Sequence, residues 1–315
     1  MEFVQKKLFH LVPVVLAVTI ITFLFVNLLP GDVAYVILGQ EATPENLAVV
    51  RAELKLDQPF PVRYLSWLGG VLTGDFGRSF ISHQPVFEAI MQRLPVTLEL
   101  ILITQFLVIF TAVPLGVLSA YKRGKWLDRI IGSLAFGLLS VPNFMMAILL
   151  IFLFSVYWGV LPATGYEPLS AGLWTNLRGF VLPALTLALI EWCALMRVLR
   201  ADIVATLQEE YILVARAKGV PRFRILFFHA LKPSLLSTVT LFAINVATMI
   251  SGSLIVETVF ALPGVGRLLV SAIYSRDYIM VQGIVLFAAM AFVVINFLVD
   301  TIYALIDPRI RHDQP

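Results

Sequence analysis

Charged residues and cysteine are scarce in this chain of 315 residues, and each scarcity excludes a class of structure. Asp, Glu, Lys and Arg make up 14% of the sequence and hydrophobic residues 59%. A soluble domain is roughly one quarter charged and about half apolar. The single cysteine, Cys193, excludes a disulfide within the chain and a cysteine-based metal cluster. So much apolar surface needs a second apolar solvent, and the sequence therefore predicts a protein that lies in a lipid bilayer.

The sequence also lacks the residues typical of three kinds of binding site, for nucleic acid, for ATP and for metal ions. The formal net charge of +3 is small and the basic residues do not gather on one face, so we expect no nucleic-acid partner. The sequence has no Gly-x-x-x-x-Gly-Lys-Ser/Thr phosphate-binding motif, because Gly124-Lys125 is followed by Trp126. An ATP site would then lie on another polypeptide, and this chain alone would not be an enzyme. No metal site and no cofactor are expected, since the histidines are scattered without metal-ligand spacing. They are His10, His83, His229 and His312.

Long apolar stretches are what the sequence does contain. Crossing roughly 30 Å of hydrocarbon takes about 20 residues of helix. Six stretches qualify, so the predicted fold class is an all-α integral membrane protein with six transmembrane helices. Pro142 lies inside the third stretch and predicts a tilted or kinked helix there. The predicted segments are an N-terminus at 1–7, helices at 8–29, 97–120, 128–157, 179–200, 235–257 and 279–305, polar regions at 30–96 and 201–234, and a C-terminus at 306–315.

Basic residues predict how these helices are oriented. Lys6 and Lys7 before an apolar run are also typical of a secretory signal peptide. The apolar core of a signal peptide has about 7–15 residues, and this run is longer, which favours an uncleaved first span. Most of the 23 Lys and Arg residues fall on one side of the predicted helices, the side of both termini and of residues 201–234. That side is predicted to be cytoplasmic, and residues 30–96 to be external.

The external region contains its own helix signal. Thr43-Pro44-Glu45 predicts a helix start with Thr43 as the N-cap and Pro44 at the first helical position, and the helix should reach about Leu54. Gly74–Phe80 is turn-rich. Two interpretations of the region stay open, a cap over the outer ends of the spans and a docking surface for an external protein.

The cytoplasmic connection at 201–234 is much longer than the ~2–8 residues that usually join antiparallel helices. A helical pattern at Glu209–Lys218 is stopped by Gly219, and Pro221 allows a new helix at Arg222–Leu231. A helix–glycine–helix unit at the membrane surface is suited to transmit force from a partner. The alternative is a basic amphipathic loop that rests on anionic lipid.

These residues, with others along the whole chain, resemble a known family. The run Glu210-Tyr211, Ala215, Ala217, Gly219, His229 and Pro233 is similar to the cytoplasmic loop of ATP-binding-cassette importer permeases, in the form found in the dipeptide, oligopeptide and nickel family. The broader importer pattern has an acid and two alanines before the glycine, whereas Leu213 and Val214 occupy the first two places here, as in the peptide and nickel branch. Further matching stretches are Leu29–Asp32, Gly74–Phe80, Leu161–Tyr166, Val256–Arg267, Arg276–Tyr278 and Asp307–Arg311.

The resemblance implies a fold, partners and a location. The chain would be the first, B-type permease subunit, with a type I importer fold over residues 97–305, a large external region after the first span and a cytoplasmic coupling helix. It would pair with a second homologous permease and two ATP-binding subunits, which carry ATP and Mg, and receive substrate from an external substrate-binding protein. The location implied is the bacterial inner membrane, in contact with lipid, with both termini cytoplasmic.

The resemblance also implies which residues couple the chain to the ATPase. Ala215 and Ala217 would allow close approach, Gly219 would break the helix, and Arg216 and Lys218 would offer charge to the rim of a groove. The complete set of expected coupling residues is Glu210, Tyr211, Ala215, Arg216, Ala217, Lys218, Gly219, His229 and Pro233.

Candidates for the translocation path come from polar residues inside predicted spans. Glu191 is near the middle of the fourth span, where an ionisable residue suggests either a path role or a polar partner on the second permease. Asn245, Thr248 and Gly252 give the fifth span a small and polar stripe, which is also typical of close helix packing. Asp300 is expected to anchor the sixth helix, and Glu257 to order an outer loop.

Two other functions and several substrates stay open. A secondary transporter driven by an ion gradient often has inverted repeats, and we find no convincing repeat in the sequence. A membrane scaffold would not need the loop at 201–234. Within the importer interpretation, the sequence does not choose between dipeptides, longer peptides, glutathione, nickel and a metal–metallophore complex.

Overall fold

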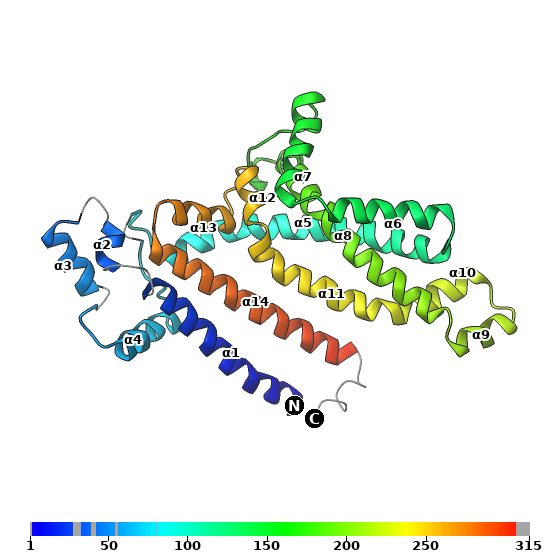
Figure 1. Cartoon of the computed structure of the whole chain (residues 1–315), viewed down its shortest axis with the longest axis horizontal. Helices are drawn as coiled ribbons and strands as arrows, with labels where there is room; N and C mark the ends of the chain where they lie inside the picture. The colour runs from blue at the N-terminus through cyan, green and yellow to red at the C-terminus, as the bar shows by residue number, and fades with distance from the viewer. Residues whose placement is uncertain (1, 28–32, 39–41, 54–55, 80, 307–315) are drawn as a thin grey trace. The chain divides into compact units, whose positions relative to one another are not determined.

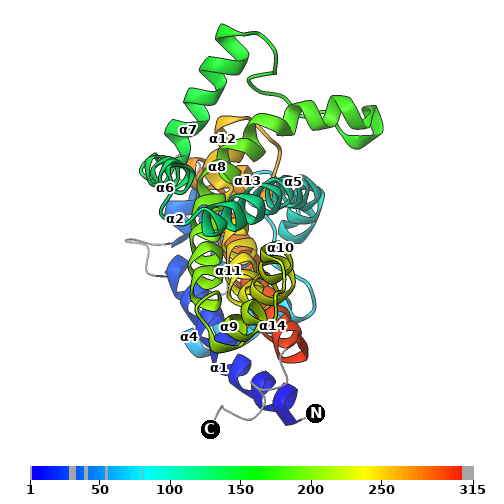
Figure 2. The ribbon, with the colours of Figure 1, turned by 90° about the vertical axis from the view of Figure 1, so that its right-hand side faces the viewer.

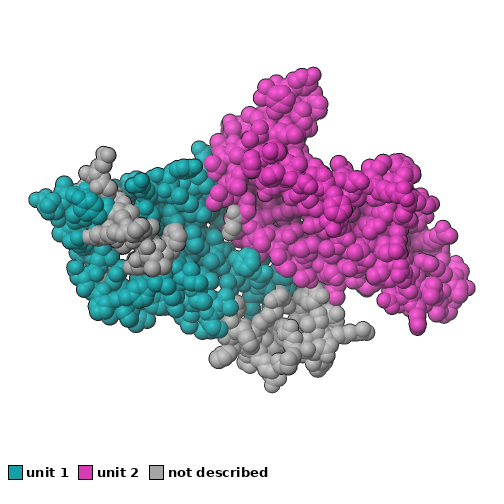
Figure 3. Space-filling model, viewed as in Figure 1, with its two compact units in different colours: residues 1–97, 263–315 teal, residues 98–262 magenta. Residues whose placement is uncertain are grey.

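The computed structural model describes residues 2–27, 33–38, 42–53, 56–79 and 81–306, and in these residues the chain is helical, with no strand beyond an isolated bridge between Arg78 and Pro85 (Figure 1). It divides into two compact units, residues 1–97 with 263–315 and residues 98–262 (Figure 3). Helix α5, Val86–Tyr121, contributes to both units. The predicted motifs Leu29–Asp32 and Asp307–Arg311 fall outside the described residues, and so does the side chain of Asp300.

The first unit contains the N-terminal and C-terminal helices. Helices α1 and α14 lie side by side, and α4 packs on α1 through an aromatic cluster (Figure 1). In this cluster the Phe23 ring lies 5.3 Å from Phe60, 5.6 Å from Tyr64 and 5.3 Å from Trp67, centroid to centroid. Besides the start of α5, the helices are α1 Glu2–Asn27, α2 Val33–Leu38, α3 Pro44–Glu53, α4 Phe60–Leu72, α13 Val265–Tyr274 and α14 Tyr278–Ile306.

Helix α3 begins where the sequence predicts. Pro44 is its first residue, and the Thr43 hydroxyl accepts a hydrogen bond from the Asn46 backbone N–H at 3.2 Å. A side-chain acceptor at this position satisfies one of the amides that a helix start leaves without a partner. The predicted N-cap is therefore confirmed.

Two of the matching stretches meet in the first unit, although nearly two hundred residues separate them in sequence. The Ser79 hydroxyl donates to the Asp277 carboxylate, and the same hydroxyl oxygen accepts the backbone N–H of Ser82 at 2.9 Å. Asp277 also caps α14, because its other carboxylate oxygen accepts the Met280 N–H at 3.2 Å. The turn after α4 is thus joined to the start of α14.

Gly283 allows a close crossing of α14 and the start of α5. A Cβ placed on Gly283 would overlap the side chain of Val86, which is fully buried with Ile90 and Ile284 in the core of this unit. Because such a core is already packed, an added methyl group has to displace its neighbours.

Replacement of Gly283 by alanine is therefore expected to destabilise the chain by about 1–2 kcal/mol. The measurement is the unfolding temperature of the purified protein in nanodiscs, and adding Val86→Ala should recover part of the loss. Gly132→Ala in α6 is the matched control, since a Cβ there has no atom within 4 Å. Equal unfolding temperatures for Gly283→Ala and Gly132→Ala would contradict the close crossing.

The second unit is built around α8, a helix of 34 residues that packs against α6 and α11. Its core joins α5, α6 and α8 through small and large residues, among them Ala112, Ala135 and Trp192. Gly116 lets α5 approach α8, since a Cβ there would lie 3.2 Å from the Met196 carbonyl oxygen. After α5 the helices are α6 Trp126–Leu139, α7 Asn143–Leu150, η2 Ile151–Tyr157, η3 Leu169–Ala171, α8 Leu173–Thr206, α9 Glu210–Ala217, α10 Arg222–Arg224, η4 Ile225–Ala230, α11 Leu231–Gly252 and α12 Leu254–Val259.

The bend in the third predicted span is much larger than the kink that the sequence predicts. Helix α6 and the α7–η2 helix meet at an angle of 104°, and Figure 2 shows α7 turning away from α6. Pro142 immediately precedes α7, at φ −61°, so the break lies at the predicted proline. A proline has no N–H to continue the ladder and disfavours helical geometry in the residue before it. The structure thus has two helices that meet at the predicted proline, and a single span over 128–157 remains a prediction.

Four helical segments are long and apolar enough to cross a membrane: Val86–Tyr121, Leu173–Thr206, Arg222–Ile250 and Tyr278–Val299. The bent pair is a fifth if it crosses as one span. In α1, the apolar helix among residues with described side chains is Val12–Leu24, which is shorter than a span. The described residues thus contain four or five candidate spans, and the six predicted from the sequence remain a prediction.

Candidate functional site

The candidate site is the segment 201–234, which the sequence predicts to be a cytoplasmic connection. Its helix α9 lies at the end of α8 beside α10 (Figures 1 and 2). Helix α9 ends with a Schellman motif. The N–H of Gly219 donates to the Arg216 carbonyl at 3.0 Å, and the N–H of Val220 donates to the Ala215 carbonyl at 3.1 Å. Gly219 has a φ of +76°, which an L-residue adopts only with strain. The predicted helix break therefore has a backbone cause.

Helix α9 presents an apolar face to its surroundings. Ile212 is fully buried and fixes the inner face, whereas Leu213 and Val214 are each more than half exposed. Ala217 and Lys218 are exposed, and Ala215 is partly buried. Exposed apolar side chains that gather on one short helix are typical of a surface that another protein covers.

Three predicted coupling residues, Tyr211, His229 and Pro233, lie close together where α9 meets the segment before α11. Pro233 has no N–H to donate to the carbonyl of His229 four residues earlier, and the Tyr211 hydroxyl donates to that carbonyl at 3.1 Å. Partial burial raises the pKa of the Tyr211 phenol, and the Glu209 carboxylate raises it further, so the hydroxyl stays a donor at neutral pH. Tyr211 therefore fastens α9 to η4, the segment that leads directly into α11.

Replacing Tyr211 by phenylalanine removes this donor and is expected to weaken the attachment of α9 by about 1 kcal/mol. Backbone amides of α9 should then exchange hydrogen about fivefold faster, measured by mass spectrometry on the purified transporter. Tyr274→Phe is the control, because that side chain is 86% exposed and lies in the other unit. Unchanged exchange in α9 after Tyr211→Phe would rule out the attachment.

The other predicted coupling residues are placed differently. Arg216 turns back toward the body of the unit, where its guanidinium donates to the Leu207 carbonyl at 3.4 Å. Glu210 is exposed in the first turn of α9. The His229 ring contacts the Arg224 carbonyl at 3.2 Å, so this histidine packs within its own segment. Lys218, which follows the last residue of α9, is exposed, as Arg216 is.

A charged network beside the site was missed by the sequence analysis. The Asp128 carboxylate accepts two hydrogen bonds from Arg200, at 2.6 Å from Nε and 2.7 Å from Nη2. It also accepts the Ser119 hydroxyl at 2.5 Å and the Gly124 N–H at 2.8 Å. The network joins the end of α5, the turn after it, the start of α6 and Arg200 in the last turns of α8. An acid at a helix start beside several basic residues was the signal available in the sequence.

Glu191, the first path candidate, lies in a polar contact between helices. It accepts a hydrogen bond from the Gln105 amide at 2.9 Å, and the same amide nitrogen contacts the Met249 sulfur of α11. The Gln105 carbonyl oxygen and the Thr104 hydroxyl are buried and have no partner. Polar groups left in this way inside a helix bundle are costly, which is the usual mark of a functional position.

The remaining path candidates lie along α11. Thr248 and Gly252 are exposed, Asn245 is partly buried, and the Thr248 hydroxyl donates to the Asn245 carbonyl at 2.9 Å. Among the described residues, the hydrogen bond of Glu191 goes to Gln105 and not to any of these three. Glu257, expected to order an outer loop, is fully buried in helix α12, where it accepts the Ser253 hydroxyl at 3.0 Å.

The described residues define a helical membrane protein with four or five candidate spans and a helix–glycine–helix unit at one end of its second part. Residues 112–312 match the family described as the binding-protein-dependent transport system inner membrane component, and residues 1–101 match the N-terminal part of such membrane components. The chain belongs to this family, which consists of transport components of the inner membrane. The resemblance inferred from the sequence is thereby confirmed.

Several named relatives are similar in sequence to this chain over nearly its full length. The dipeptide transport system permease protein DppB of Escherichia coli is 35% identical, over 99% of this chain and 99% of its own. A Brucella abortus protein named for a peptide transport system permease is 43% identical, over 98% of this chain and 99% of its own. A Sinorhizobium fredii protein named for a peptide ABC transporter permease is 37% identical over 98% and 99%.

Proposed function

We propose that this chain is the permease subunit of an ATP-binding-cassette importer that takes up dipeptides or longer peptides. The observation that carries the proposal is the end-to-end similarity to permeases named for peptide transport, which includes both units. Glutathione, nickel and metallophore uptake, which the sequence left open, have no observation in their favour. They remain predictions.

The proposed assembly follows the family. The chain crosses the inner membrane six times with both termini in the cytoplasm, and residues 97–305 form the type I permease domain. It pairs with a second homologous permease to enclose the path, and an external substrate-binding protein delivers the peptide. Two separate ATP-binding subunits bind ATP and Mg and perform the hydrolysis. Glu191, Asn245, Thr248 and Gly252 are the proposed path residues of this half.

Helix α9 is the proposed coupling helix. Leu213 and Val214 supply exposed apolar surface for a groove on the ATP-binding subunit, and the small side chains of Ala215 and Ala217 let that groove approach closely. Lys218 adds charge at the rim. Motion of α9 passes to α11 through the Tyr211 hydroxyl and to α8 through the short link at 207–209. The two long helices then move together and alternate the access of the path.

The experiment isolates the tagged chain gently from its native membrane and identifies the proteins and ligand recovered with it. The expected result is a second permease, ATP-binding subunits and a binding protein that carries a peptide. Uptake of a radiolabelled dipeptide into vesicles should require internal ATP. A lone chain or a homo-oligomer that transports on an ion gradient would overturn the proposal, and a binding protein loaded with nickel would correct the substrate.

A further inference from the structure

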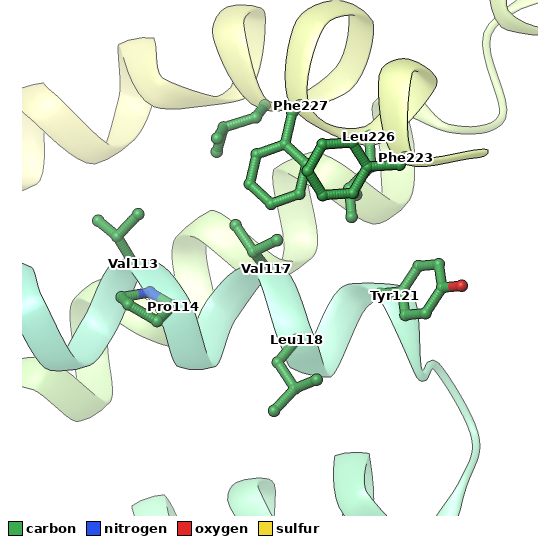
Figure 4. A pocket seen from close by; sticks show the side chains of 9 residues that line it. Val113, Pro114, Val117, Leu118, Tyr121, Phe223, Leu226 and Phe227 are labelled. Atoms are coloured by element: carbon green, nitrogen blue, oxygen red, sulfur yellow. The ribbon is translucent and has the colours of Figure 1, made fainter. Parts of the chain in front are cut away.

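An open apolar cleft of about 480 Å³ lies between the end of α5 and the segment that follows α9. Figure 4 shows Val113 and Val117 of α5 on one side and the rings of Phe223 and Phe227 on the other. The centroids of the two rings are 4.4 Å apart, and the ring planes are tilted by 39°. Phe223 is 66% exposed and Phe227 38%, so the cleft holds apolar surface that the described part of the chain does not cover.

A second cavity, of about 440 Å³, adjoins the cleft and has a different character. The two share Tyr121 and Leu226, so one opens beside the other. Two guanidinium groups, of Arg216 and Arg222, line the second cavity, and none of its lining residues is acidic. The single described hydrogen bond of the Arg216 guanidinium goes to the Leu207 carbonyl, and a guanidinium has five N–H donors.

Other charges around this pair are mostly positive. The Lys122 ammonium lies 5.2 Å from the centre of the Tyr121 ring, and Arg123 and Lys125 follow in the same turn. Arg224 is exposed on α10. The acids of this part of the chain are Glu209 and Glu210, which are exposed, Asp202 in α8, and Asp128, whose charge is paired with Arg200; none of them lines the cavity. The polar cavity therefore favours an anion.

We propose that the cleft and the polar cavity together bind one anionic phospholipid. An acyl chain lies along Val113, Val117 and Phe227, and the phosphate lies between Arg216 and Arg222. The apolar cleft and the cationic cavity adjoin, so a ligand that fills both has to be an amphiphile. Phosphate suits the cationic part, because Arg binds phosphate through two parallel hydrogen bonds. The inner leaflet of a cytoplasmic membrane is rich in anionic lipid, and basic pockets there recognise its head groups. The placement of this end on the cytoplasmic side comes from the proposed function.

Such a lipid would contact α5, Arg216 near the end of α9, and the segment that follows α9. The polar cavity would change shape if α9 moved relative to α5, because Arg216 of α9 and Ala120 of α5 both line it, and the cleft is lined by α5 and the segment that follows α9. The bound lipid is therefore a part of the surface through which motion of α9 reaches α5. Activity should depend on anionic lipid for this reason.

The test uses the complete transporter, reconstituted in nanodiscs of mixed phosphatidylglycerol and phosphatidylcholine. The transporter is then released from the nanodiscs, and the lipid that stays bound to it is identified by native mass spectrometry. Wild type is expected to retain phosphatidylglycerol in preference. Arg222→Gln should retain it about fivefold less, since each basic group near the surface contributes about that factor. Arg224→Gln is the matched control, on the same short helix but lining neither cavity.

The apolar half is tested by Val113→Phe, which fills the cleft, against Ile109→Phe one turn earlier on α5, which lines neither cavity. Loss of phosphatidylglycerol in Val113→Phe but not in Ile109→Phe supports the proposal. Equal retention of both lipids, or no effect of Arg222→Gln, would overturn it. An anion site that survives Val113→Phe would indicate free phosphate, and cross-links from Phe227→Cys to another subunit would indicate a protein occupant; either result also overturns it. Because lipid retention does not depend on uptake, a failure of the proposed function would leave this readout intact.

Discussion

Replacing Gly219 by valine is expected to lower ATP-dependent uptake at least tenfold while the chain still inserts and assembles. The residue has a φ of +76°, where a β-branched side chain costs about 1–2 kcal/mol. A Cβ there has no atom within 4 Å, so the strain comes from the backbone and not from crowding. Relieving it breaks the two hydrogen bonds that end α9 and changes the direction in which the chain enters α10. In the proposed function α9 is the coupling helix, and a helix that points in a different direction would not fit the groove of its partner.

The measurement combines uptake of labelled dipeptide with ATP hydrolysis in the reconstituted transporter. Hydrolysis should continue at its basal rate but no longer respond to the substrate-binding protein. Gly159→Val is the matched control, because Gly159 has a φ of +62° and equally open surroundings but lies in the loop after η2. Equal losses in the two variants would mean that general instability is responsible, and normal uptake in Gly219→Val would remove α9 from the coupling path.

Features that depend on neighbouring residues could be predicted from the sequence. The N-cap at Thr43 and the helix break at Gly219 each require a residue type with a specific local geometry, and the structure has both. Pro142 marks the correct position of the bend, but its size, 104°, does not follow from one proline. The angle is set by what each half packs against, and the pattern of one chain does not contain that information.

Contacts between distant segments could not be predicted. Tyr211 and His229 were named separately, and only the fold brings the hydroxyl of one to the carbonyl of the other. Ser79 and Asp277 lie in two stretches that the family shares, yet nothing in either stretch indicates that they bond. Arg200 is the last residue of the helix predicted at 179–200, and nothing beside it in the sequence indicates that it pairs with Asp128. Pairing partners so far apart are chosen by helix packing, so one sequence identifies the residues without their partners.

These contacts make α9 part of a larger rigid group. Its inner residue Ile212 is buried, Tyr211 fastens it to η4, which leads into α11, and the Thr206 hydroxyl at the end of α8 lies 3.2 Å from the Ser234 hydroxyl. A force applied to α9 is therefore shared by α8 and α11 instead of being absorbed by a loose loop. The remaining requirement is that α8 be held against α5 and α6 at the same end.

The Asp128–Arg200 pair meets this requirement, and breaking it is expected to cost more stability than the other substitutions. Removing one partner of a buried ion pair costs about 3–5 kcal/mol, because the other charge is left without compensation. Asp128 is 8% exposed but the Arg200 side chain is 33% exposed, and water there reduces the expected cost to about 2–3 kcal/mol. Asp128→Asn and Arg200→Gln should each lower the unfolding temperature of the assembled transporter and reduce uptake.

The double variant distinguishes a specific pair from two independent defects. If the two groups act through each other, Asp128→Asn with Arg200→Gln loses clearly less than the sum of the single variants. Arg200→Lys keeps the charge but cannot form the bidentate hydrogen bonds, so its unfolding temperature and uptake should lie between those of wild type and Arg200→Gln. Arg197→Gln one turn earlier is the control, since Arg197 lies 4.4 Å over the Phe136 ring and does not contact Asp128 in the described network. Strict additivity, or equal losses from Arg197→Gln, would show that the network does not hold α8 in place, and the rigid group would then have to be anchored by apolar packing alone.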